Sequence, residues 1–232
     1  MFFYPRIFPG FFIFLLMNGE YMEKLELNKV YCMDCLKGLK LLPDNSVDLI
    51  LTDPPYGISK DGIVNDDTLW AYDINYGRLL KEDGILIIFT STKYLKDVIN
   101  LINLPYKWQF IWYCSNNMIP GGIGFAKYTS ALIFSNGKVF KNAQDLKCFP
   151  AGTKELRDVN HPTPKPLKII RYLVDKFSDR NSIILDPFMG SGTTAVACKQ
   201  LGRNFIGFEI IPEYVDICNK RLNQSNIKEW FE

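Results

Sequence analysis

Residues 184–195 read ILDPFMGSGTTA, and this stretch decides the fold class. It begins with apolar residues typical of a buried strand, turns at Gly190 and Gly192, and continues as the helical pattern of residues 193–201. Glycines let a ligand approach the backbone closely, and the N-terminus of the following helix presents free N–H groups. The stretch therefore predicts a strand–turn–helix unit with a ligand at the turn. Glycines that only permit close packing of strand and helix are the alternative.

The same alternation continues outward along the chain. Strands are expected at residues 30–33, 47–52, 85–89, 109–114, 131–135, 182–185 and 205–208. Helical patterns occupy residues 36–42, 69–80, 94–102, 166–177, 193–201 and 212–223. Alternating strands and helices are typical of a parallel sheet with helices on both faces. The sequence predicts a single α/β domain with a doubly wound, mostly parallel, seven-stranded sheet.

The composition is that of an ordinary globular protein. The chain has 232 residues, of which 47% are hydrophobic and 22% charged, and its net charge of +2 indicates neither nucleic acid nor membrane. A single histidine, His161, excludes any site with two histidine ligands, and we expect no metal. Six scattered cysteines do not form a disulfide framework, so we expect free thiols and a cytoplasmic protein. A redox or zinc function of the pair Cys32 and Cys35 is the alternative.

Two segments depart from the alternating pattern. Residues 1–17 are apolar and rich in phenylalanine but too short and proline-broken for a membrane helix, so we expect residues 1–21 to be a dispensable apolar extension before a domain at 22–232. Residues 118–160 form an irregular insertion, which in a compact domain is usually functional. Residues 127–180 carry eleven Lys/Arg against five Asp/Glu. This balance favours a polyanionic partner such as DNA, although a solvated face has the same charge pattern.

A second unusual turn, DPPYG at residues 53–57, follows the expected strand 47–52. Parallel sheets bind ligands at the carboxyl ends of their strands. Pro54 and Pro55 remove backbone donors and stiffen the loop. The Asp53 carboxylate and the Pro54 carbonyl are left as acceptors beside the ring of Tyr56. Acceptors next to an aromatic face predict a pocket for a planar group that carries an amino donor.

Three motifs resemble those of amino-group DNA methyltransferases. Residues 53–56 (DPPY) are similar to the catalytic motif, residues 186–193 (DPFMGSGT) to the S-adenosylmethionine motif, and residues 161–166 (HPTPKP) to the element before the cofactor strand. Their order is that of the β class, a circular permutation of the usual arrangement. The resemblance covers roughly residues 27–223 and implies the S-adenosylmethionine-dependent methyltransferase fold. One departure is WYCSNN at residues 112–117, which lacks the lysine that family members commonly place there.

The resemblance also implies a role for each motif residue. Asp53, Pro54, Pro55 and Tyr56 would form the catalytic loop. The residues expected to bind the cofactor are Asp34, His161, Thr163, Lys165, Asp186, Phe188, Gly190, Ser191, Gly192, Thr193, Thr194 and Glu209. For Asp34 a plain aspartate at a strand end is the alternative, and Glu209 is placed for ribose hydroxyls. The basic insertion, as target-recognition segment, would bind DNA through Lys127, Lys138, Lys141, Lys147, Lys154 and Arg157.

The expected function is methylation of adenine N6 in a short duplex DNA sequence, by base flipping and direct transfer from S-adenosylmethionine. An aspartate at position 53 favours adenine, because cytosine-N4 enzymes more often carry serine there. The alternatives are a cytosine-N4 enzyme, an RNA or protein-glutamine methyltransferase, an NAD-dependent oxidoreductase, and a non-catalytic DNA-binding regulator. The NAD alternative depends on the pattern G-x-G-x-x-A at 190–195. A homodimer and a companion restriction endonuclease are further expectations, and no membrane partner is expected.

Overall fold

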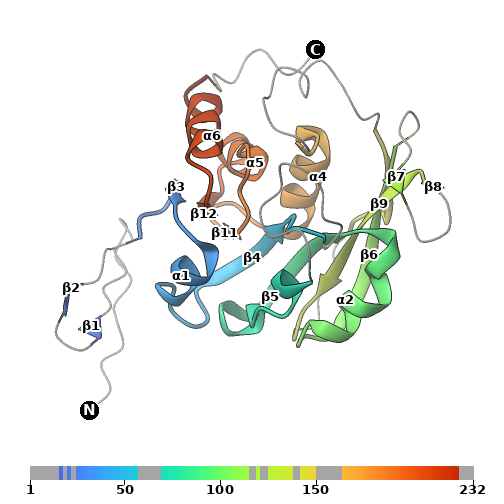
Figure 1. Ribbon diagram of the computed structural model, residues 1–232, viewed down its shortest axis with the longest axis horizontal. Helices are drawn as coiled ribbons and strands as arrows, with labels where there is room; N and C mark the ends of the chain where they lie inside the picture. Colours follow the sequence, from blue (N-terminus) through green and yellow to red (C-terminus); the bar gives the residue numbers. More distant parts are fainter. Residues whose placement is uncertain are drawn as a thin grey trace.

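The computed structural model describes residues 16–17, 20–21, 25–56, 69–114, 119–120, 125–137, 142–149 and 164–224. Within them, eight strands form one sheet in the order β10-β6-β9-β5-β4-β11-β12-β3 (Figure 1). All neighbours run parallel except β9 (Tyr128–Phe134), which is antiparallel to both β5 and β6. The predicted α/β class with a mostly parallel sheet is confirmed.

All seven predicted strands are present, and an eighth was not predicted. The seven comprise β9 together with β3 (Lys29–Cys32), β4 (Val47–Thr52), β5 (Leu80–Thr90), β6 (Tyr106–Tyr113), β11 (Ile183–Asp186) and β12 (Asn204–Glu209). The eighth, β10 (Leu146–Cys148), pairs with β6 at the edge of the sheet. Its three residues alternate between exposed and half-buried, so they show no apolar run that would predict a strand. Two short antiparallel pairs complete the list: β1 (Leu16–Met17) with β2 (Glu20–Tyr21), and β7 (Ile119–Pro120) with β8 (Phe125–Ala126).

The helices agree with the prediction in five of six places. They are α1 (Cys35–Lys40), α2 (Leu95–Leu101), α4 (Leu167–Phe177), α5 (Thr193–Leu201) and α6 (Pro212–Gln224), with a 3-10 turn η3 (Thr92–Tyr94) before α2.

The helix predicted at residues 69–80 is wrong. Two 3-10 turns, η1 (Trp70–Tyr72) and η2 (Tyr76–Arg78), stand there instead. The Asn75 side chain accepts a hydrogen bond from the Arg78 N–H, which favours a turn over a continuing helix. The buried Tyr72 and Tyr76 then donate their hydroxyl groups to backbone carbonyls, so tertiary contacts hold this segment in place.

The core consists of two layers, one on each face of the sheet. One layer packs β4 and β5 against α4 and α5, and the other packs the same strands against α1 and α2. In β4, Leu49 and Leu51 belong to the first layer and Ile50 to the second. Figure 1 shows α4, α5 and α6 on one side of the sheet and α1 and α2 on the other. Helices on both faces explain why the central strands are apolar throughout.

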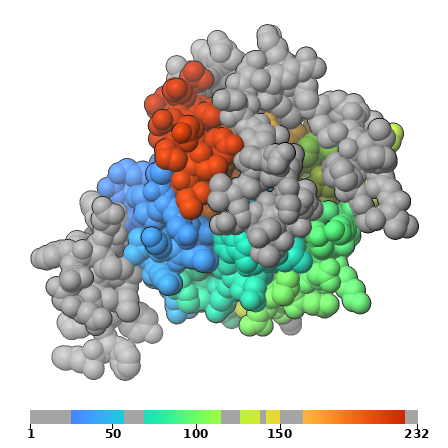
Figure 2. Space-filling view, in the orientation of Figure 1, coloured from blue at the N-terminus to red at the C-terminus, as the bar shows by residue number. Residues whose placement is uncertain are grey.

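This topology brings motifs that are distant in the sequence together at the carboxyl ends of the central strands. The parallel strands β4 and β11 are neighbours, and β11 pairs with β12. Their carboxyl ends are Thr52, Asp186 and Glu209, so the DPPY turn and the glycine turn lie next to each other. Helix α6 packs beside β3 and β12 on the flank of the glycine turn, where Figure 2 shows it against the N-terminal part of the domain.

The six cysteines are free thiols. In the Cys32–Cys35 pair, burial raises the pKa of the Cys35 thiol to about 12, which disfavours the thiolate that redox or zinc chemistry needs. Cys35 is the first residue of α1 and packs in the core, so its position has a structural explanation. Within the described part of the chain, none of the helices is long and apolar enough to cross a membrane.

Candidate active site

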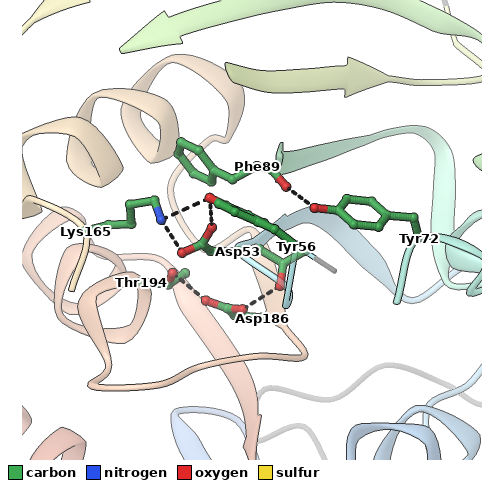
Figure 3. Close-up of polar contacts among 8 residues, drawn as sticks. Asp53, Tyr56, Tyr72, Phe89, Lys165, Asp186 and Thr194 are labelled. Atoms are coloured by element: carbon green, nitrogen blue, oxygen red, sulfur yellow. Dashed lines mark hydrogen bonds and ion pairs between the residues drawn. The ribbon is translucent and has the colours of Figure 1, made fainter. Parts of the chain in front are cut away.

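Asp186 cross-links three elements at the carboxyl end of the sheet. It is 4% exposed and accepts hydrogen bonds from Thr52 Oγ1 on β4 (2.8 Å), Thr194 Oγ1 on α5 (2.6 Å) and the Phe188 N–H (3.1 Å). Figure 3 shows Asp186 with its bond to Thr194, below Asp53 and Tyr56. Burial raises the pKa of Asp186 to about 6 against the pull of these donors. The donated proton of Thr194 is therefore used inside the protein, although the sequence predicts that it contacts the cofactor.

Asp186 is expected to make stability depend on pH. Because its pKa rises from 3.8 to about 6 on folding, the native state binds more protons between these values. The contribution to stability is present below about pH 4 and is lost as the pH rises through about 6. An Asp186→Asn variant lacks this dependence. Its destabilisation should be smaller at about pH 7.5 than at about pH 4.5, by about 2 kcal/mol. Urea unfolding at both values measures this, and an equal or larger loss at the higher pH would contradict it.

The glycine turn is tied to the end of β12. Gly190 and Gly192 have φ angles of 52° and 83°, in the left-handed region that favours glycine. Glu209 accepts hydrogen bonds from the N–H groups of Gly190 (2.8 Å) and Ile211 (2.9 Å), one on each carboxylate oxygen. Burial raises the pKa of Glu209. Since each carboxylate oxygen has a second lone pair, both can still accept hydrogen bonds from a ligand.

Arg221 on α6 contacts the glycine turn, and this contact was not predicted from the sequence. Its Nη1 donates to the Ser191 carbonyl (2.7 Å), to Ser191 Oγ (3.2 Å) and to Thr193 Oγ1 (3.1 Å). The two hydroxyl groups accept from the guanidinium, so their own protons remain available for an anionic ligand. An arginine late in an amphipathic helix carries no local signal of this role, because the contact depends on how α6 packs against the turn.

The loop of residues 53–56, predicted to be catalytic, follows directly after β4. Tyr56 donates its hydroxyl to Asp53 Oδ1 (2.5 Å), and Lys165 Nζ donates to Asp53 Oδ2 and to the Tyr56 hydroxyl, the latter at 3.2 Å (Figure 3). Behind the loop, Tyr72 donates to the Phe89 carbonyl (3.0 Å). Lys165, predicted to contact the cofactor, thus has its ammonium group against Asp53 and Tyr56.

The remaining predicted residues lie in several places. Asp34 caps α1 by accepting from the Leu36 N–H (2.7 Å), which agrees with the strand-end alternative. Phe188 packs edge-on against Trp70, with 5.7 Å between ring centroids. Lys127 is exposed, whereas Lys147 donates to Gln144 and lies over the ring of Tyr172. Outside the described residues lie His161, Thr163, Lys138, Lys141, Lys154 and Arg157, together with most of 1–21 and much of 118–160.

The comparisons with known proteins agree on one family. The family model described as DNA methylase (N6_N4_Mtase) matches residues 126–220. The methylase YubD of Escherichia coli (strain K12) is 31% identical over 211 residues, which cover 82% of this chain and 87% of YubD. The type II methyltransferase M.HpaI of Haemophilus parainfluenzae is 28% identical over 239 residues, covering 84% of this chain and 74% of M.HpaI.

Solved structures show the same relationship. The crystal structure of the M1.HpyAVI–SAM complex superposes with a TM-score of 0.65 at 29% identity, covering 84% of this chain and 98% of that one. The DPPY turn and the glycine turn, which resemble family motifs in the sequence, meet at one edge of the sheet in the fold. The chain therefore belongs to the N6/N4 family of DNA methylases of restriction-modification type, enzymes that take their methyl group from S-adenosylmethionine.

Proposed function

We propose that this protein methylates adenine N6 at a specific short sequence in duplex DNA. One observation carries the proposal: the hydrogen bond from Thr52 to Asp186 joins the ends of β4 and β11, from which the catalytic loop and the glycine turn start, so an acceptor for an amino group would stand beside a cofactor site. Separate sites for nucleotide binding and DNA binding would not need this link. The predicted domain, residues 22–232, would hold the whole reaction.

The residues at the glycine turn fit S-adenosylmethionine. The hydroxyl protons of Ser191 and Thr193 suit its carboxylate, and the free lone pairs of Glu209 suit its ribose hydroxyls. Phe188 offers a half-buried aromatic surface for the adenine ring. When bound, S-adenosylmethionine supplies an electrophilic methyl group. The chain itself supplies binding, orientation and charge.

The catalytic loop would activate the amino group of the target base as a nucleophile toward the methyl group. The lone pair of an exocyclic amine is delocalised into the base, so the nitrogen is a poor nucleophile. Asp53 and the Pro54 carbonyl would accept hydrogen bonds from the two N–H groups of the amine. The nitrogen lone pair is then free to point at the methyl group. The Asp53 charge faces the positive charge that develops on this nitrogen. The target base must leave the duplex to reach the loop, and stacking on Tyr56 would stabilise it by roughly 1–3 kcal/mol.

Nucleoside analysis of methylated DNA tests the proposal. Duplex DNA of mixed sequence is incubated with the protein and S-adenosylmethionine, digested to nucleosides and examined by mass spectrometry. We expect N6-methyladenine with the wild-type protein and none with Asp53→Ala. N4-methylcytosine would support the second candidate, a cytosine enzyme, and keep the mechanism. No methylated nucleoside of either kind would contradict the proposal and favour an RNA or protein substrate.

Arg221 is expected to control cofactor affinity without touching the cofactor. An Arg221→Met variant loses the three hydrogen bonds to Ser191 and Thr193, so their hydroxyl groups are no longer oriented. We expect the KM for S-adenosylmethionine to rise about tenfold, as for the loss of one charge-assisted hydrogen bond, with little change in kcat. Steady-state kinetics measure both constants. The matched control is Lys220→Met, at the exposed position next to it. Equal effects of the two substitutions would show that only charge matters.

The basic segment 118–160 is the proposed target-recognition region. Its lysines would contact DNA phosphates, and exposed Lys127 at the end of β8 (Phe125–Ala126) is the best placed of the described ones. Lys147 is engaged with Gln144 and Tyr172 and would have to release them to reach a phosphate. A homodimer and a companion endonuclease remain part of this proposal.

A further inference from the structure

We propose that Lys165 is a positioning residue of the catalytic loop, which holds the Asp53 carboxylate and the Tyr56 hydroxyl in the orientation that receives the target amino group. The inference depends on the proposed function, because the orientation of Asp53 matters only if its carboxylate accepts this amino group. It gives Lys165 a different role from the cofactor contact that the motif resemblance implies.

The first argument is geometric. Lys165 Nζ, the Asp53 carboxylate and the Tyr56 hydroxyl form a closed triangle of three hydrogen bonds. Each carboxylate oxygen accepts one donor, so rotation of the Asp53 side chain would break at least one bond. The second lone pair on each oxygen stays free for an amino hydrogen. The triangle therefore fixes the direction of Asp53 without using up its capacity to bind substrate.

The second argument is burial. The Lys165 side chain is 13% exposed and that of Asp53 26%, whereas the comparable Lys81–Asp48 pair has 45% and 30%. The Lys165 ammonium also lies over the rings of Tyr56, at 5.5 Å, and Phe89, at 5.3 Å from the centroids. Aromatic faces attract a cation and exclude water. A lysine held in this way interacts with its carboxylate far more strongly than an exposed lysine does.

The third argument is the surroundings of the pair. Among the described residues, the other titratable groups that face it are Asp186 on β11, Tyr56 itself and Cys114 after β6. Burial raises the pKa of Cys114 to about 11, so its thiol is neutral and cannot take the place of the ammonium group. Among these groups, Lys165 is therefore the cation that can orient the Asp53 carboxylate.

The first experiment observes the orientation of Asp53 directly. Crystal structures of the wild-type protein and of Lys165→Met are compared at the loop of residues 53–56. In Lys165→Met we expect the Asp53 carboxylate to rotate, because the Tyr56 hydroxyl is then the one described donor that still holds it. Lys165→Arg should keep the wild-type orientation. The matched control, Lys81→Met, removes an ion pair at the opposite end of β4 and should leave Asp53 unchanged.

The second experiment measures activity. In Lys165→Met we expect kcat to fall about 10- to 100-fold near neutral pH, because a misplaced carboxylate no longer orients the amino group, and the KM for S-adenosylmethionine to change less than threefold. Lys165→Arg keeps a cation at this position and should recover most of the activity.

The outcomes separate the inference from the proposed function. An Asp53 carboxylate that keeps its orientation in Lys165→Met overturns the inference whether or not DNA is methylated. A raised KM for S-adenosylmethionine with unchanged kcat also overturns it, because it assigns Lys165 to the cofactor. Lower thermal stability with unchanged kcat would leave Lys165 a merely structural role and likewise overturn it. A rotated carboxylate in Lys165→Met, together with a wild-type protein that methylates no DNA, supports the positioning role and contradicts only the proposed function.

Discussion

An Asp53→Ala variant is expected to lose methyl transfer almost completely while it keeps its fold. Asp53 lies on a turn after β4, is partly exposed, and makes its described side-chain contacts only with Tyr56 and Lys165. Removing one preorganised group that stabilises developing charge typically lowers kcat by about 10²–10³-fold. We expect at least this loss in single-turnover transfer to duplex DNA. Calorimetry should detect S-adenosylmethionine binding at near wild-type affinity, because the residues proposed to bind the cofactor follow β11 and β12.

Two further variants show which property of Asp53 matters. Asp53→Asn keeps an acceptor oxygen but loses the charge, so its kcat should fall between those of the wild type and Asp53→Ala. The matched control is Asp48→Ala, which removes an aspartate with a lysine partner from the other end of the same strand. This control should lower stability, since Asp48 also accepts from the Ile183 N–H, but leave kcat unchanged. Wild-type kcat in Asp53→Ala would exclude a catalytic role for the loop.

The strands were predictable because their signal is local. A buried parallel strand is apolar on both faces, and β4 and β11 each read as an apolar run followed by a turn. The same signal is missing where a strand lies at the edge, as β10 does with its half-exposed residues. The segment 69–80 has the apolar spacing of a helix, but Tyr72 and Tyr76 are buried by contacts with β5 and neighbouring backbone. Tertiary contacts of this kind cannot be read from a window of sequence.

The site was predictable to the extent that its residues belong to motifs. Asp53, Asp186 and Glu209 each follow an expected strand, and neighbouring parallel strands bring such residues to one edge. The partners of these residues depend on packing. Arg221 reaches the glycine turn from a helix 30 residues further on, and Lys165 reaches Asp53 across 112 residues. Sequence motifs therefore predict which residues belong to the candidate site, and packing of the fold determines which atoms these residues contact.

The largest effect on the fold is expected from Gly192→Ala. Gly192 has a φ angle of 83°, and a Cβ atom there would lie 2.2 Å from Cys218 Sγ, 2.8 Å from its Cβ and 3.1 Å from its Cα. The left-handed backbone costs about 1–2 kcal/mol for alanine, and forcing α6 outward adds roughly 1–3 kcal/mol. We expect a loss of about 2–5 kcal/mol in the free energy of unfolding, measured by urea denaturation. S-adenosylmethionine binding should also weaken, because Arg221 moves with α6.

Gly192 precedes α5, and the glycine at the other end of α5 provides a control that separates backbone strain from the steric clash with Cys218. Gly202 follows α5 with a φ angle of 68°, but a Cβ atom there would meet only the Arg180 side chain, at 3.7 Å and beyond. Gly202→Ala should therefore cost only the backbone strain, about 1–2 kcal/mol. Adding Cys218→Ala to Gly192→Ala removes the sulfur, which is the nearest atom, but leaves the backbone of α6 equally close, so it should recover part of the loss. Equal destabilisation by the two glycine variants, with no recovery in the double variant, would mean that the close approach of the glycine turn to α6 does not limit this position.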